Sequence, residues 1–172
     1  MSNITLYSLS DYNAGNLIPH TFDLDTIDTR DEWYQAVSEW LEAVDKKLGN
    51  DIYTPKREEW IVCDYEDIPS CYVGEWDIDD TYWTFKETVE ASSLDLEVFK
   101  AAADCDIPPE DVEDCYQGEF STDEDFAYEL AESTGAIDEG ATWPMNCIDW
   151  ESAARELMME YTSHNGHYFS SY

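Results

Sequence analysis

Residues 29–49 read TRDEWYQAVSEWLEAVDKKLG, and this stretch predicts a helix with a marked start and end. Thr29 precedes Glu32 by three residues, which is the capping-box pattern of a helix N-terminus, and Gly49 supplies the stop. Apolar residues recur between them at helical spacing: Trp33, Val37, Trp40, Leu41, Val44 and Leu48. The other face carries three acids, Glu39, Glu42 and Asp45.

Short strands are expected on both sides of this helix. Residues 4–9 and 17–24 are strand candidates, and the turn-rich residues 11–16 between them predict a hairpin. Residues 60–63 are expected to form a short buried strand. The first 66 residues therefore predict an N-terminal α+β domain, a small sheet with one helix packed on it.

The middle of the chain, residues 67–108, has a helical character. Apolar residues recur at helical spacing over residues 78–89, and residues 94–103 predict a second helix. Pro108 and Pro109 then break the chain. This segment is expected to form a central helical domain that joins two end units.

The last part, residues 109–172, predicts a C-terminal α+β domain. A short helix is expected over residues 110–115, and a capping box from Ser121 to Glu124 opens a helix that Gly135 ends. Another helix is expected from Ile148, with Trp150, Ala153, Ala154, Leu157 and Met158 inward, and a final strand over residues 167–171. The fold class expected for the whole chain is α+β.

The charge balance excludes several classes of protein. The 172 residues include 41 Asp and Glu but only 8 Lys and Arg, which gives a formal net charge of −33. A nucleic-acid binder or a protein that docks on an anionic membrane needs a basic face. Disorder is also disfavoured, because 15% of the residues are aromatic.

The acids are unevenly distributed, which a general adaptation to high salt does not explain. Residues 101–172 hold 18 acids and one base, Arg155. Neither a membrane span nor a secretory signal is recognisable. The five cysteines contain no C-x-x-C pair and are interpreted as reduced, mostly buried thiols of a cytoplasmic protein: Cys63, Cys71, Cys105, Cys115 and Cys147.

No metal, cofactor or catalytic site is expected. The segment that starts at Asp77 resembles a calcium loop at first, but Tyr82 and Thr88 stand where such a loop needs Gly and Glu. His164 and His167 lack further zinc ligands and predict a terminal turn. No nucleophile, phosphate-loop or dinucleotide motif is present, so an acidic hydrolase is the last of the hypotheses.

The arrangement of the acids is the remaining functional signal. Acids four residues apart on a helix lie about 5–6 Å from each other, and duplex DNA carries one charge per ~1.7 Å, so a charge of −33 matches roughly 56 Å of duplex. From charge alone, a phosphate-like surface and an ordinary solvated acidic face stay equally open. The residues predicted to form the acidic surface are Glu39, Glu42, Asp45, Asp79, Asp80, Glu110, Asp111, Glu113, Asp114, Glu119, Asp123, Glu124, Asp125, Glu129, Glu132, Asp138 and Glu139.

Three ordered motifs resemble those of the ArdA antirestriction family, whose members are carried by plasmids, conjugative transposons and phages. Residues 6–17, LYSLSDYNAGNL, are similar to a strand followed by Tyr-Asn-x-Gly-x-Leu. Residues 116–135 contain the Tyr-Gln-Gly-Glu-Phe, Phe-Ala and Thr-Gly pieces. Residues 146–157, NCIDWESAAREL, resemble the segment Asn-Tyr-[Ile/Phe]-Asp-Tyr-Glu-x-Tyr-Ala-Arg-Asp-Leu, with departures at Cys147, Trp150, Ala153 and Glu156.

The resemblance implies an elongated, curved protein of three small domains that forms a homodimer through its C-terminal domain. It implies a non-enzymatic mimic of bent DNA that occupies the DNA-binding groove of type I restriction–modification enzymes in a bacterial cytoplasm. Arg155 is then expected to be an internal salt-bridge partner. An acidic mimic aimed at another DNA-binding target, such as a CRISPR effector, another defence system or a nucleoid protein, is the alternative. The implied dimer interface comprises Thr134, Gly135, Ala136, Ile137 and Trp143.

Overall fold

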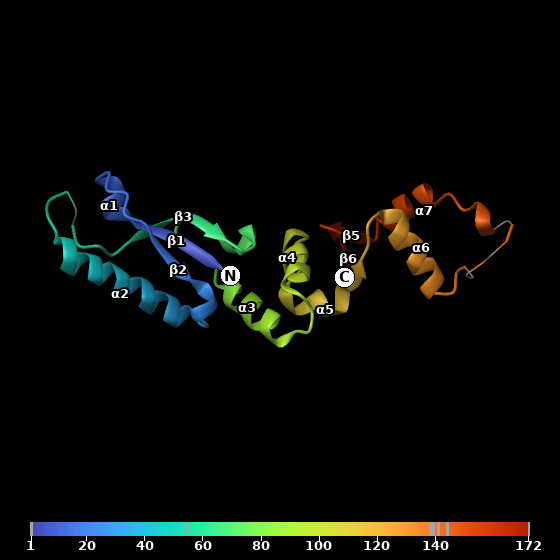
Figure 1. The fold of residues 1–172 in the computed structure, drawn as a ribbon, viewed down its shortest axis with the longest axis horizontal. Coiled ribbons are helices and arrows are strands. Elements are labelled where there is room, and N and C mark those ends of the chain that lie inside the picture. Colours follow the sequence, from blue (N-terminus) through green and yellow to red (C-terminus); the bar gives the residue numbers. More distant parts are fainter. Residues whose placement is uncertain (1, 54, 138–139, 141, 144, 172) are drawn as a thin grey trace. The chain divides into compact units, whose positions relative to one another are not determined.

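The computed structural model describes residues 2–53, 55–137, 140, 142–143 and 145–171. Their contacts divide the chain into two compact units, unit 1 (Met1–Ala91) and unit 2 (Ser92–Tyr172). Each unit contains a three-stranded antiparallel sheet and several helices, which confirms the expected α+β class (Figure 1). The division into three domains at residues 66 and 108 stays a prediction.

The described residues of unit 1 form three strands, three α-helices and two short 3-10 helices. In chain order they are β1 (Asn3–Ser8), α1 (Leu9–Asn13), β2 (His20–Asp23), η1 (Leu24–Thr26), α2 (Arg30–Leu48), β3 (Trp60–Glu66), η2 (Ser70–Tyr72) and α3 (Thr81–Ala91). The strand order is β2-β1-β3, so β1 lies in the middle (Figure 1). Its buried side chains alternate along the strand, as expected for a sheet that covers a core on one face.

Helix α2 forms as its sequence predicts. The hydroxyl of Thr29 accepts a hydrogen bond from the N–H of Glu32 at 3.3 Å, and Gly49 ends the helix with a positive φ of 74°. Trp33, Val37 and Leu41 are buried. Phe22 of β2 meets the Trp33 ring edge-on at 5.1 Å, so the apolar face of the helix packs on the sheet.

The hairpin at the N-terminus differs from its prediction in two respects. Residues 9–13, which span the end of the expected first strand and the start of the expected turn at 11–16, form helix α1; Ser8 caps it by accepting a hydrogen bond from the N–H of Asp11. The second strand begins at His20 rather than at residue 17. Pro19 gives the physical reason, because it has no N–H for a sheet and restricts the residue before it.

Strand β3 is longer and less buried than expected, because it is an outer strand of the sheet. The backbone N–H of Val62 donates to the carbonyl of Glu75 at 2.9 Å, so the chain itself covers the first half of this edge. The second half ends in the exposed acids Asp64 and Glu66.

Unit 2 begins with two helical stretches close to the predicted ones. Its elements are α4 (Leu96–Asp104), η3 (Pro109–Asp111), α5 (Val112–Cys115), β4 (Tyr116–Glu119), α6 (Asp123–Ser133), η4 (Met145–Cys147), α7 (Trp150–Leu157), β5 (Tyr161–His164) and β6 (His167–Ser170). The helix expected over residues 94–103 is α4, and the one expected over residues 110–115 is formed by η3 and α5. The sheet order is β4-β6-β5, and Phe169 in the middle strand is fully buried. Helices α6 and α7 pack together, with Tyr128 and Trp150 in ring contact at 5.2 Å.

Several further expectations, most of them for unit 2, need correction. Strands β4 and β5 were not expected as strands. The cap of α6 is Thr122, whose hydroxyl accepts from the N–H of Asp125 at 3.1 Å, rather than Ser121. The cysteines are not mostly buried, since Cys63, Cys71 and Cys147 are exposed. The predicted terminal turn is confirmed, because Asn165 and Gly166 connect β5 and β6 with positive φ values of 51° and 84°.

Candidate acidic surface

Basic side chains lie next to acids throughout the part of the chain that the structure describes. Seven of the eight Lys and Arg residues there form a salt bridge with a carboxylate of the same unit: Arg30, Lys46, Lys56, Arg57, Lys86, Lys100 and Arg155. The cations are thus dispersed and compensated individually, and the excess negative charge remains on other carboxylates.

Arg57 is the most deeply buried of these cations, with a side chain only 2% exposed. Its Nε and Nη2 donate to the two carboxylate oxygens of Asp11 at 2.6 and 2.8 Å, and its Nη1 donates to Asp45 at 2.8 Å. The hydrogen bond with Arg57 lowers the pKa of Asp11, and the bond to Asp11 raises the pKa of Arg57. The two acids are separated from Arg57 by 46 and 12 residues, so the cluster fixes three segments together.

The predicted acids of unit 1 are mostly engaged with other groups. Asp45 differs from its prediction, since its carboxylate is only 14% exposed and shares Arg57 with Asp11 rather than lying free on the acidic surface. Glu42 and Asp80 are exposed but pair with Lys46 at 3.5 Å and Arg30 at 2.7 Å. The carboxylate of Asp79 accepts hydrogen bonds from Thr81, which lower its pKa, and Glu39 is exposed and accepts from Gln35 at 2.8 Å.

The predicted acids of unit 2 form a denser group around α6. Residues 92–172 hold 20 acids and only Lys100 and Arg155 as bases. The two bases bind Glu97 and Glu151, neither of which belongs to the predicted surface. Arg155 forms the expected salt bridge within the chain, with Glu151 at 3.1 Å, and at 71% exposure this pair lies on the surface of α7.

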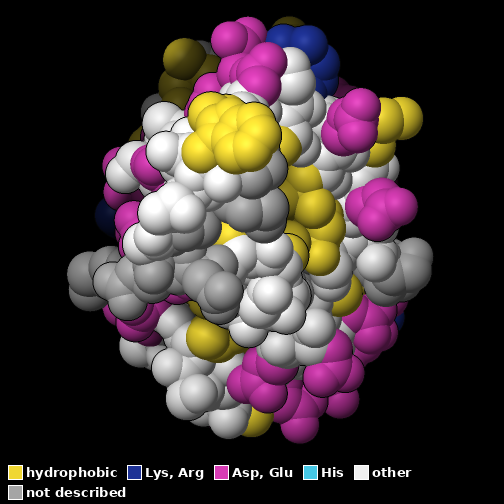
Figure 2. Space-filling model, turned by 90° about the vertical axis from the view of Figure 1, so that its right-hand side faces the viewer, with side chains coloured by type: hydrophobic (Ala, Val, Ile, Leu, Met, Phe, Trp, Pro, Cys, Tyr) yellow, Lys and Arg dark blue, Asp and Glu magenta, His cyan; other side chains and the backbone are white. Residues whose placement is uncertain are grey.

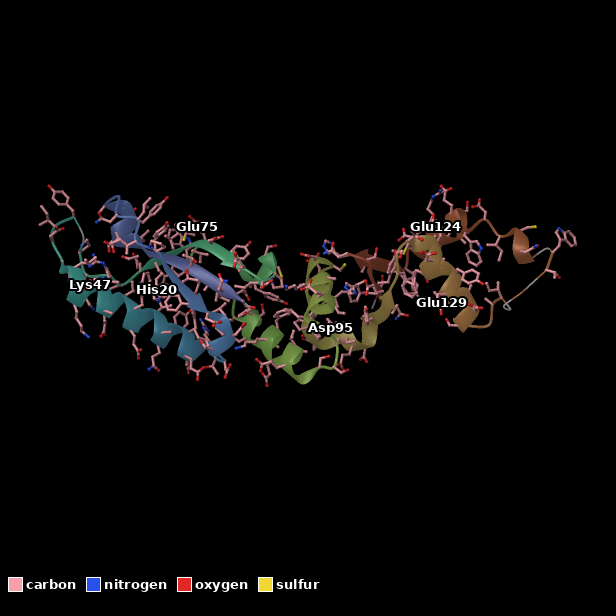
Figure 3. All side chains as sticks on the ribbon, viewed as in Figure 1. His20, Lys47, Glu75, Asp95, Glu124 and Glu129 are labelled. Carbon is pink, nitrogen blue, oxygen red and sulfur yellow. The ribbon has the colours of Figure 1, made fainter. Side chains whose placement is uncertain are left out.

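Helix α6 positions several of these carboxylates by its own geometry. Its first turn holds three acids in succession, where the positive end of the helix dipole favours negative charge. Figure 3 shows Glu124 and Glu129 on this helix, and Asp95 at the start of α4. Asp123 accepts a hydrogen bond from the hydroxyl of Tyr168 at 2.7 Å, and burial together with this bond raises the pKa of Tyr168 to about 12.

The remaining predicted acids flank α6 along the chain. Glu110, Glu113, Asp114, Glu119, Asp125 and Glu129 are exposed, whereas Asp111, Glu124 and Glu132 are half-buried. The hydroxyl of Ser92 forms a short hydrogen bond with Glu113. Asp138 and Glu139 lie outside the described residues. The structure thus brings most of the predicted carboxylates of residues 110–132 to the exterior of one unit.

The residues implied to form a dimer interface follow α6 directly. Thr134 closes the helix by donating from its hydroxyl to the carbonyl of Leu130 at 2.7 Å, and Gly135 continues with a φ of 72°. Ala136 and Ile137 then donate their N–H groups to the carbonyl of Ala131.

Two large apolar side chains among the described residues of unit 2 are mostly exposed. Trp143 is 79% exposed and Met159 is 82% exposed. Figure 2 shows one face of the molecule, on which hydrophobic side chains lie among Asp and Glu. An exposed apolar group of this kind is typical of a contact surface.

The described residues meet the requirements of neither a metal site nor a membrane-spanning helix. Among the described residues, no three His, Cys, Asp or Glu side chains are grouped so as to hold a metal ion. His164 contacts Asp104 at 3.2 Å, and His167 contacts the hydroxyl of Tyr116 at 3.1 Å, so each imidazole has a separate partner. No described helix combines the length and apolar character needed to cross a bilayer.

The sequence model of the ArdA antirestriction proteins matches residues 6–169. The chain belongs to the ArdA antirestriction family. This confirms the resemblance seen in the three motifs, and it gives the protein an antirestriction function directed at restriction enzymes. A search of curated proteins gave no match to this ArdA chain.

Proposed function

We propose that this ArdA protein is a non-enzymatic DNA mimic that inhibits type I restriction–modification enzymes by occupying their DNA-binding groove. The observation that carries the proposal is the group of outward carboxylates on residues 110–132, in a stretch that contains no Lys or Arg from residue 101 to residue 154. Proteins that bind DNA attract its negative phosphates with basic grooves. A surface of fixed carboxylates presents the same negative charge to such a groove as the phosphates do.

The like charges on this surface oppose folding, because they repel one another. Unit 2 offsets this cost locally, through the helix dipole at Asp123, Glu124 and Asp125 and through the core beneath α6. The acids thus remain outward and uncompensated on a helix that Phe126 anchors in the core. A chain selected only for solubility does not require this concentration of charge next to a tightly packed helix.

The proposed assembly is a homodimer in the cytoplasm of a bacterial host. Thr134, Gly135, Ala136, Ile137 and Trp143 are the residues proposed to lie at the dimer contact. The exposed indole of Trp143 supports this, because its 79% exposure leaves a large apolar surface in water. The division into three small domains in an elongated, curved body is part of the same proposal.

Competition between this protein and duplex DNA for a purified type I enzyme tests the proposal. At low salt, increasing amounts of the protein should displace labelled DNA, and added salt should weaken this inhibition because the contacts are between charges. DNA binding that stays unaffected by a molar excess at low salt would refute the proposal. If the enzyme is unaffected but another DNA-binding protein is displaced, the alternative target class is correct.

A triple variant tests the role of the acidic surface. Neutralising Glu124, Asp125 and Glu129 to Gln, Asn and Gln keeps their shape and should weaken inhibition more than any single change. A matched control neutralises three exposed acids outside the predicted surface: Glu87, Glu156 and Glu160. Equal effects of the two triple variants would mean that net charge, rather than this surface, determines inhibition.

A further inference from the structure

Unit 1 contains a groove whose lining includes none of the residues of the predicted acidic surface. One hollow of about 540 Å³ is lined by three aromatic rings and three carboxylates: Tyr34, Trp60, Trp76, Glu58, Glu59 and Asp77. A second hollow of about 710 Å³ shares Leu9, Glu58 and Glu59 with the first, so the two are continuous. These two hollows together are called the aromatic groove below.

The rings of the aromatic groove are partly open to water. Trp76 is 51% exposed, although burying an indole is among the larger sources of apolar stabilisation. Tyr34 and Trp60 contact each other with ring centres 6.1 Å apart and planes tilted by 54°. The groove is therefore an open aromatic site and not a part of the packed core.

The same cluster already holds one guanidinium from the chain itself. The Cζ of Arg30 lies 5.2 Å from the centre of the Tyr34 ring, and its Nη2 donates to the Tyr34 hydroxyl at 3.3 Å. Arg30 also pairs with Asp80 at 2.7 Å. An aromatic face flanked by a carboxylate is thus an arrangement that binds arginine in this protein.

The charges along the groove select the class of ligand. Asp77 accepts hydrogen bonds from the indole of Trp33 at 2.8 Å and the hydroxyl of Tyr34 at 2.6 Å, and these neutral donors orient its carboxylate without cancelling its charge. Glu58 pairs with Lys56 at 2.8 Å, whereas Glu59 is exposed. Unit 1 as a whole holds 21 acids and 6 bases, so an anionic ligand such as a nucleotide is repelled.

We propose that the aromatic groove binds an arginine side chain of a protein partner. The flat guanidinium stacks on the exposed ring of Trp76 while Glu59 and Asp77 supply the opposite charge; a lysine ammonium cannot stack in this way. The indole N–H of Trp60, whose ring lines the groove, has no acceptor among the described residues and gives a local reporter of binding. The inference rests on the proposed function for where the arginine comes from: the DNA-binding groove of the target enzyme, which is rich in basic side chains, would supply it.

Titration of the isolated protein with N-acetylarginine methylamide tests the recognition itself. Binding is followed by NMR at the indole N–H of Trp60, with N-acetylcitrulline methylamide as the uncharged probe and N-acetyllysine methylamide as the second cation. The arginine probe should shift this signal in a saturable manner. It should bind more tightly than both other probes.

Variants locate the site. Trp76→Ala should weaken the arginine probe about two- to tenfold, which is the range for one lost cation–π contact, and Trp76→Phe should retain most of the binding. Because Trp76 is half exposed, its loss leaves the fold in place. Tyr65→Ala is the control, since Tyr65 is an exposed aromatic of β3 that does not line the groove.

The outcomes separate this inference from the proposed function. Equal binding of the arginine and citrulline probes, tighter binding of the lysine probe, or unchanged binding by Trp76→Ala would overturn the inference, and displacement of DNA by the intact protein would still stand. Arginine binding that is lost in Trp76→Ala supports the inference, even where the enzyme competition fails and the proposed function falls.

Discussion

Replacing Arg57 with methionine should destabilise unit 1 more than most single substitutions. The guanidinium of Arg57 makes two hydrogen bonds to Asp11, whose side chain is also only 2% exposed, and further bonds to Asp45, Gly49 and Asn50. Removing one partner of a buried ion pair leaves the other as an uncompensated buried charge, which costs about 3–5 kcal/mol. This is a large part of the total stability of about 5–15 kcal/mol expected for a small domain.

Urea unfolding followed by tryptophan fluorescence measures this loss. Five of the seven tryptophans precede residue 92, so the signal reports mainly on unit 1. With a denaturant slope of roughly 2 kcal/mol per M, a loss of 3–5 kcal/mol lowers the midpoint by about 1.5–2.5 M. The double variant Asp11→Asn with Arg57→Met should recover part of this loss, because it removes the orphaned charge.

The same cluster makes stability depend on pH in a defined direction. The pKa of Asp11 is lower in the folded protein than in the unfolded chain, where it is about 3.9. Its contribution is therefore complete above that value and is lost as the pH falls through the lower, folded pKa. The Arg57 variant should lack this acid-dependent component. Two results would refute the reasoning: a loss in the free energy of unfolding below about 1 kcal/mol at neutral pH, or a double variant whose loss equals the sum of the losses of the two single variants.

Three more predictions concern the helix start, alkaline pH and the proposed dimer. Thr29→Ala should cost about 1 kcal/mol in urea unfolding, because the N–H of Glu32 loses its acceptor; no change would contradict the cap. The pKa values of Tyr168 and Tyr82 are raised to about 12, so their contributions are complete below pH ~10 and are lost as the pH rises through 12. In an absorbance titration Tyr168 and Tyr82 should titrate late, and in Asp123→Asn the pKa of Tyr168 should fall. Trp143→Ala should shift the proposed dimer towards monomer in sedimentation at a given concentration, with Trp76→Ala as the exposed-indole control; equal masses for both variants would count against the interface.

Local sequence signals predicted the helices well and the sheets less completely. Thr29 and Gly49 bracket α2 because caps act through neighbouring backbone groups, which the sequence displays directly. Strands β4 and β5 have four residues each, too few for a clear alternation, and they form because β6 pairs with both.

Helical spacing was enough to predict that the acids of residues 110–132 face outward. It could not predict which residues far apart in the chain pair with each other. Asp11 was visible only as part of a turn, and its partner Arg57 lies 46 residues further along the chain. The pairing of Asp45 with Arg57, 12 residues further along, was hidden too, because it also depends on a contact outside the helix. The aromatic groove was also missed, because Tyr34, Trp60 and Trp76 come from three segments that only the folded chain brings together.

The outer edge of β3 has a consequence for how this protein behaves when concentrated. A bare strand edge can recruit an identical strand from another molecule and start an ordered aggregate. Here the carbonyl of Glu75 occupies the first half of the edge, and Asp64 and Glu66 charge the second half, so that two copies repel each other. This protection depends on ionised carboxylates. Where Asp64 and Glu66 are replaced by Asn and Gln, β3 is the segment from which fibril growth is expected to start.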